Sequence, residues 1–211
     1  NSAVTEESLV LGVTTLIPQS IKKWISISDE VNDLKGEEFL DYIYDELTYR
    51  IAKKAADVLV AAIVACTTGG SDNHPMVNQI TATAVSVGLV AKALAQISDE
   101  AANPVVIMNK LTYAEFLAAQ AGGSFNYDPF MGMPVLFTSA LPAYSAASAN
   151  EVYMIVGDLA GVTGNFPNGF TPSLIVDRLS LAEADLVKVV GRLPMGHAVV
   201  APNHFAVVVK S

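Results

Sequence analysis

The chain has 211 residues, of which 52% are apolar and only 16% are charged, where about a quarter charged is usual. This composition excludes a disordered chain, and Pro, Gly, Asn or His interrupts every uncharged run that is long enough for a transmembrane helix. The net charge of −9 argues against a nucleic-acid-binding module, which needs a basic patch to neutralise phosphates. A chain so apolar and so poor in charge is expected to cover part of its surface with copies of itself.

The single cysteine and the start of the chain give further expectations. Cys66 lies in an apolar helical run, so we expect an inert buried thiol and no internal disulfide. The first 15 residues contain Glu6 and Glu7 but no Lys or Arg, which predicts no signal peptide. Because the chain starts at Asn1 rather than Met, we expect a processed or cut chain.

The first half of the chain is dominated by one long amphipathic pattern. Apolar and polar residues partly alternate over residues 22–27, which predicts a short strand. The acidic residues 28–36 are expected to form a loop. Apolar residues then recur every three or four positions, which predicts a helix over residues 37–65 that is about 40 Å long. Such a spine is well beyond the usual helix of about 11–12 residues and is typical of assembly proteins.

The middle of the chain begins with the segment TTGGSDNHP at 67–75, which ends the spine. An Ala-, Val- and Leu-rich segment predicts a second helix over residues 78–101. The apolar run at 104–108 predicts a buried strand, and a capping box predicts a third helix over residues 112–120.

The last third predicts strands and few helices. The expected strands lie at residues 134–138, 152–156, 174–176 and 186–190, followed by two strands and a turn within 198–210. Helices and strands are mixed without a regular alternation, so the predicted fold class is α+β.

No motif in the sequence predicts catalysis, a cofactor or a metal. His74, His197 and His204 lack partners at metal-ligand spacing. A phosphate-binding loop needs a Lys and then a Ser or Thr after its glycines, and this pair does not follow the glycines at 69–70. The glycines between 157 and 164 are expected to lie in a loop between strands. Ser139, Ser145 and Ser148 lie in no nucleophile motif, and Asp41 with Asp45 is expected to form a solvated helix face. We therefore predict no catalytic, cofactor-binding or metal-binding residue, and a protein that is not an enzyme.

Three stretches, taken in order, resemble the major capsid protein of tailed bacteriophages. This is the HK-ninety-seven type fold, which encapsulins and the herpesvirus capsid floor share. The matching residues are IPQS (17–20) and DEV (29–31); VIMN (106–109), Thr112, GG (122–123), GMPV (132–135) and LP (141–142); and GD (157–158), Arg192, Gly196, Pro202, Phe205 and Ala206.

The resemblance implies a peripheral domain and an axial domain. The peripheral domain would comprise residues 1–76, with the spine, and residues 190–211. The axial domain, residues 77–189, would point its loops at the five- and six-fold axes. The Gly- and Pro-rich segment 161–172 is either such a loop or an ordinary surface loop. The family has an N-terminal arm and a long hairpin arm before the spine, and we expect only the returning end of that hairpin here. We assign no cross-linking residue, Asn203 included.

The function that the resemblance implies is that of a structural subunit of an icosahedral phage or prophage capsid. It would assemble into hexamers and pentamers in the bacterial cytoplasm and enclose packaged DNA. The implied partners are other copies of the chain, together with a scaffold, a portal and a maturation protease. The resemblance implies no sequence-specific binding of nucleic acid and no membrane. Two alternatives stay open: an encapsulin-type compartment shell and a small α+β enzyme. The enzyme would show a pocket with convergent titratable groups.

Overall fold

The computed structural model describes residues 16–66, 77–121 and 128–211. It has three α-helices, nine strands and three short 3-10 helices within these residues. The helices are α1 (Asp29–Ala65), α2 (Leu89–Leu94) and α3 (Lys110–Ala121), with 3-10 turns η1 (Leu159–Gly161), η2 (Ala182–Ala184) and η3 (Pro202–His204). The strands are β1 (Gln19–Ser28), β2 (Asn78–Ala82), β3 (Pro104–Met108), β4 (Val135–Phe137), β5 (Val152–Asp158), β6 (Val162–Asn165), β7 (Ser173–Asp177), β8 (Leu186–Val199) and β9 (Phe205–Lys210).

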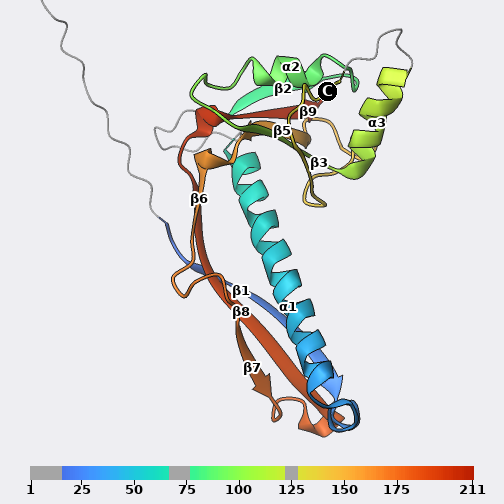
Figure 1. Cartoon of the computed structure of the whole chain (residues 1–211), viewed down its shortest axis with the longest axis vertical. Coiled ribbons are helices and arrows are strands. Elements are labelled where there is room, and N and C mark those ends of the chain that lie inside the picture. The colour runs from blue at the N-terminus through green and yellow to red at the C-terminus, as the bar shows by residue number, and fades with distance from the viewer. Residues whose placement is uncertain (1–15, 67–76, 122–127) are drawn as a thin grey trace, which may run out of the picture.

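Helix α1 is the predicted spine, and it connects two sheets that lie at opposite ends of the molecule (Figure 1). Its 37 residues correspond to a length of about 55 Å at 1.5 Å per residue. The predicted loop over 28–36 is wrong, because strand β1 passes directly into the helix at Ser28. The backbone of Ser28 is still extended, with φ −63° and ψ 138°. Acidic residues in the first turn are favoured by the helix dipole, so the acidic sequence there suits a helix start as well as a loop.

The first sheet, sheet A, packs against the first half of α1. Strand β8 is its centre: β1 pairs antiparallel along one edge, and β7 and β6 pair antiparallel with successive parts of β8. Ile43 and Leu47 of α1 are buried against Ile27 of β1 and Val189 of β8. The strand predicted at 22–27 is confirmed and is longer, because the whole of β1 finds partners on β8.

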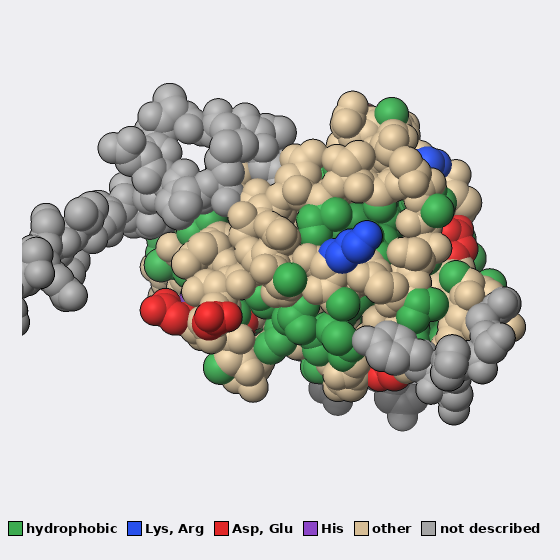
Figure 2. Space-filling view, turned by 90° about the horizontal axis from the view of Figure 1, so that it is seen from above, with side chains coloured by type: hydrophobic (Ala, Val, Ile, Leu, Met, Phe, Trp, Pro, Cys, Tyr) green, Lys and Arg blue, Asp and Glu red, His purple; other side chains and the backbone are tan. Residues whose placement is uncertain are grey.

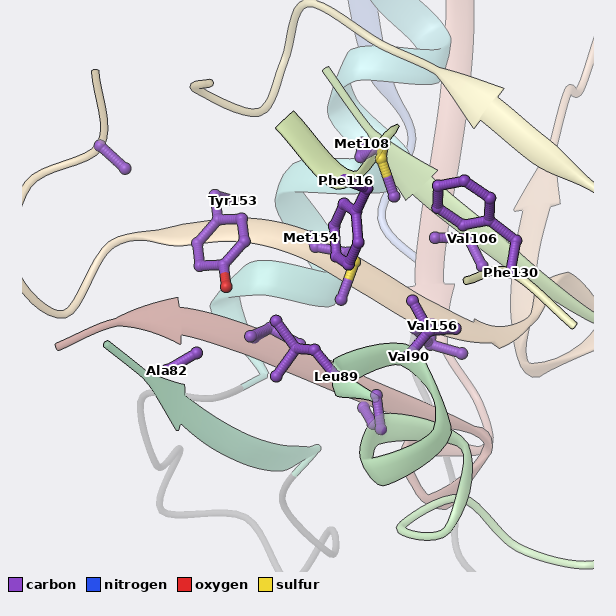
Figure 3. Packing of buried hydrophobic residues seen from close by; sticks show 14 residues of the cluster. Ala82, Leu89, Val90, Val106, Met108, Phe116, Phe130, Tyr153, Met154 and Val156 are labelled. Carbon is purple, nitrogen blue, oxygen red and sulfur yellow. The ribbon is translucent and has the colours of Figure 1, made fainter. Parts of the chain in front are cut away.

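The second sheet, sheet B, has the strand order β2-β9-β5-β3-β4. Every residue of its central strand β5 is buried. On one face Phe116 of α3 and Val90 of α2 pack over Met154 and Met108 (Figure 3). On the other face lies the last part of α1, where Ile63 packs into a second cluster with Phe205.

The helix predicted over residues 78–101 is wrong for most of its length. Residues 78–82 form strand β2, which pairs parallel with β9, and only Leu89–Leu94 is helical. Ile80 and Thr81 are β-branched and favour a strand once β9 offers a free edge, so pairing overrides the local helical pattern. The strand at 104–108 and the third helix are confirmed, as are the strands at 134–138, 152–156 and 174–176. The strand predicted at 186–190 continues to Val199, so only one of the two strands expected within 198–210, β9, begins there.

The pairing of strands crosses the predicted domain boundary. Strand β9, expected with the spine in the peripheral part, lies between β2 and β5 in sheet B. Strand β7, expected in the axial part, pairs with β8 in sheet A. The division into residues 1–76 with 190–211 and residues 77–189 stays a prediction. In the described part of the chain, no helix combines the length and the apolar run that a membrane crossing needs.

Two connections between the sheets pass close to each other near Asp158, and we call this place the crossing. The chain leaves β5 through η1 into β6, beside the passage from β8 through η3 into β9. The buried Asp158 carboxylate accepts hydrogen bonds from the N–H of Ala160 at 2.9 Å and of Asn103 at 3.1 Å. A Cβ on Gly157 would lie 2.5 Å from the carbonyl oxygen of His204. The expected loop from 157 to 164 is therefore the end of β5, the turn η1 and strand β6.

The Gly157→Ala substitution should destabilise the fold, because the new methyl group meets backbone that cannot move away. We expect a loss of about 1–3 kcal/mol or more in the free energy of unfolding. Gly88→Ala is the matched control, since nothing lies within 4 Å of its Cβ position, and it should cost less than about 1 kcal/mol. Urea unfolding measures both, and equal losses would contradict the close crossing.

Asp158→Asn should lower stability in a pH-dependent way. The two backbone N–H groups, that of Ala160 foremost, hold the pKa of Asp158 below its ordinary value. A lowered folded-state pKa stabilises the fold above the pKa of the unfolded chain and is lost as the pH falls through the folded value. We expect a deficit of about 1–2 kcal/mol in the variant at pH 7 that shrinks below about pH 4. A deficit that is constant between pH 7 and pH 3 would contradict the assignment.

Candidate assembly surfaces

The residues singled out for possible chemistry lie apart from one another. His197 is in β8 and His204 is in η3, whereas His74 and the glycines at 69–70 lie outside the described residues. No three His, Cys, Asp or Glu side chains converge on a possible metal position within the ranges that the structure describes. Asp41 and Asp45 are exposed on α1, as predicted for a solvated helix face.

Cys66 forms the C-cap of α1 and is half-buried. Burial raises the pKa of its thiol, so the sulfur is mainly protonated at neutral pH. A protonated thiol is a poor nucleophile, which is the direction expected for an inert cysteine.

A groove of about 790 Å³ lies between the second half of α1 and the edge of sheet B. One wall is the α1 face that carries Tyr49, Lys53 and Val60. The opposite wall is edge strand β4 with the residues after it, including Phe137 and Ser139. The groove lies where α1 crosses sheet B near β4, which is an edge strand in the described part of the chain.

The rim of the groove exposes large apolar side chains. Tyr49, Leu136, Phe137 and Leu159 are all exposed. The Phe137 ring packs edge-on against Tyr113 of α3, with 5.3 Å between centroids, and remains 48% exposed. Together these groups form a ready-made apolar contact surface.

The charged groups of the groove do not form a catalytic arrangement. Lys53, Asp57 and Lys110 line it, and the described residues show no hydrogen bond or ion pair among these three. The Lys110 ammonium lies 5.6 Å from the Phe137 ring centroid, a cation–π distance. An apolar groove with separated charges is suited to bind a protein segment rather than to transfer a proton.

The end of the molecule that sheet B forms is also poor in charge. Figure 2 looks down on this end: hydrophobic side chains gather in the middle of the visible face around one Lys or Arg side chain, and the few Asp and Glu side chains lie toward its edges. A contiguous apolar area on the surface marks a site of protein contact.

A family model, described as the phage capsid family, matches residues 1–210 of the sequence. The chain belongs to the phage capsid family. It is therefore a structural component of a virion capsid and not an enzyme. No curated protein matches the chain significantly in sequence.

Solved capsid structures share the fold at low sequence identity. The capsid of an empty GTA particle is 18% identical, with a TM-score of 0.69, and the match covers 100% of this chain and 81% of that one. The protein of Gordonia phage Cozz is 15% identical (TM-score 0.60; 100% of this chain, 78% of that one). The capsid of cyanophage P-SCSP1u is 11% identical (TM-score 0.61; 100% and 80%).

These matches confirm the resemblance, the α+β fold class and the capsid function that the sequence predicted. Among the residues that carried the resemblance, the GD pair at 157–158 lies at the crossing between the sheets. Phe205 and Ala206 begin the buried strand β9 next to it. The groove was not foreseen, because the sequence does not show that β4 is an edge strand or that α1 passes beside it.

Phe137→Glu should impair assembly of the capsid protein without unfolding it. A contact that covers the groove would have to bury the new carboxylate and would lose the apolar ring, which costs several kcal/mol even with the Lys110 ammonium nearby. We expect the concentration needed for assembly to rise at least about tenfold, as measured by light scattering. Val200→Glu is the control, because Val200 is similarly exposed and lies outside the groove. Unchanged assembly by Phe137→Glu would contradict a role of the groove.

Proposed function

We propose that this capsid protein assembles into hexamers and pentamers that form an icosahedral shell around packaged DNA. The observation that carries the proposal is the groove between α1 and β4, together with membership of the family. A ring of identical subunits needs two different surfaces on each copy that fit one another. The groove supplies one apolar surface of this kind. The related GTA particle was computed with C5 symmetry, which is the symmetry of a pentamer.

We also propose that the two sheets correspond to the two functional parts of the subunit. The axial part would be sheet B with α2 and α3, and the peripheral part would be sheet A with most of α1. This moves the boundary from residues 77–189 to the limits of the sheets, because β9 pairs inside sheet B and β7 inside sheet A. The low-charge end in Figure 2 would then face the ring axis. The loop at 166–172 would lie in the peripheral part, between β6 and β7.

The charge of the chain supports a container that does not hold its DNA tightly. A net charge of −9 leaves few cations to neutralise phosphates. Weak contact with the wall permits the genome to move during packaging and release. A scaffold, a portal and a maturation protease are the further partners we propose, with assembly in the bacterial cytoplasm.

Electron microscopy of the full-length protein expressed in bacteria tests the proposal. We expect closed angular particles of uniform diameter, with five-fold vertices in class averages. Phe137→Glu serves as the paired sample and should yield dispersed subunits.

Two results would overturn the proposal. One is dispersed wild-type subunits even when a scaffold protein from the same genome is co-expressed. The other is tubes or open sheets without five-fold vertices, since only pentamers close a shell of hexamers.

A further inference from the structure

The face of sheet A that points away from α1 carries ordered rows of side chains. Directly paired residues of antiparallel strands share a face, and neighbours along a strand alternate. Ile25 and Val189 are paired and pack toward α1. The opposite face therefore carries the paired residues Trp24, Val190 and Ile175 in one row, and Lys22 with Arg192 in the next. We call these five residues the outer face.

The outer face leaves two cations side by side without a counter-charge. Register places Lys22 directly opposite Arg192, and both are exposed. Like charges directly opposite each other are destabilising. Among the described residues, neither cation forms an ion pair. An incoming carboxylate would relieve this repulsion.

The neighbouring row offers an apolar surface beside those cations. Trp24 is 58% exposed and Ile175 is 43% exposed. The Lys188 ammonium lies 4.8 Å from the centroid of the Trp24 ring, and Trp24 is still largely exposed. The outer face thus fits a partner that brings acidic groups next to an apolar group.

The loop between β7 and β8 has that composition and lies at the far end of the same sheet. It presents Leu179, which is 88% exposed, with the exposed carboxylates of Glu183 and Asp185. We call these three residues the tip (Figure 1, bottom). Asp177 orders the loop, because its side chain accepts hydrogen bonds from the N–H groups of Leu179 and Ser180, each at 3.0 Å, and from the Ser180 hydroxyl. The tip is therefore built before any partner arrives.

We propose that the outer face of one copy binds the tip of a second copy, with Glu183 and Asp185 opposite Lys22 and Arg192 and Leu179 against the row of Trp24. The proposal deepens the proposed function, because it names one of the contacts between subunits on which that function rests. Leu179 is almost fully exposed, so the tip does not cover the outer face of its own copy. The contact is heterologous and can therefore propagate around a symmetry axis.

Nucleic acid is the less suitable occupant of the outer face. A duplex backbone would satisfy Lys22 and Arg192 but would leave the exposed apolar row of Trp24 and Ile175 without a matching group. A protein partner that carries both carboxylates and a leucine matches both rows. The chain itself has such a segment, and copies of it are abundant wherever a shell forms.

Two charge-altered variants test the contact. The face variant carries Lys22→Glu and Arg192→Glu. The tip variant carries Glu183→Lys and Asp185→Asn, where Asn is chosen because Asp185 has a φ of 50° and Asn tolerates this left-handed region. Each variant keeps one intact surface. Arg50→Glu with Lys23→Glu is the control, because it makes the same charge change as the face variant on α1 and on the side of β1 that faces α1.

Sedimentation equilibrium at low salt gives the readout, with circular dichroism to check folding. We expect self-association of each variant to weaken at least about tenfold relative to wild type and to the control. An equimolar mixture of the two variants should associate at least about tenfold more tightly than either alone, because the intact tip of one meets the intact face of the other. The mixture stays informative even if one variant is less stable, since it needs only the intact surface of each.

Three outcomes would overturn the proposal: variants that associate as wild type does, a mixture no tighter than its components, or a face variant that loses only binding to a random-sequence DNA duplex. The proposed function fails separately. If wild-type protein forms no shells but the mixture still pairs, the contact stands and the shell does not. If shells form equally in all variants, the shell stands and the contact does not.

Discussion

Burial of α1 against both sheets is the constraint on which the rest of the molecule depends. Leu47 and Ile51 are fully buried in the first part of the helix, and Ile63 is buried in the last. Removing one such side chain to Ala costs about 2–5 kcal/mol, so the helix holds the sheets in one fixed relation. Tyr49 and Lys53 line the groove on the side of α1 that turns toward sheet B, next to the buried Ile63. One helix therefore organises the core against both sheets and also supplies one wall of the groove.

The crossing near Asp158 is the second link between the sheets, and it explains why particular small residues stand there. At Gly161, as at Gly157, a Cβ would press against backbone and against the ring of Phe205. The Asp158 carboxylate then accepts hydrogen bonds from the backbone of residue 103, just before β3, and of residue 160, just after β5. A shell subunit whose two parts are fixed by a helix and by this crossing transmits the orientation of one contact to the next, since packed interiors yield little.

The sequence predicted those elements whose pattern depends on local periodicity and on flanking breakers. The spine was found because its apolar residues recur over many turns, and the buried strand β3 because its apolar run is short and bounded. The predicted start of α1 was wrong because acidic residues suit a loop and the first turn of a helix equally well. The helix predicted over residues 78–82 was wrong because these residues form a strand only by pairing with β9, which lies more than a hundred residues away in the sequence. The domain boundary depends on the same long-range pairing.

The contact surfaces could not be predicted from the sequence, for a related physical reason. Whether Phe137 is core or rim depends on β4 being the last strand of its sheet. Whether Lys22 repels Arg192 depends on a register that joins residues far apart in the chain. Composition did indicate that such surfaces exist, since few charges and many apolar groups must be covered by something. In an acidic chain, cations that the fold gathers on one face without partners are a local excess that only an incoming acidic group can balance. The excess of acidic groups makes copies of the chain repel one another in most orientations. The orientation in which acidic groups meet these cations is favoured instead, so the charge pattern selects which surfaces come into contact.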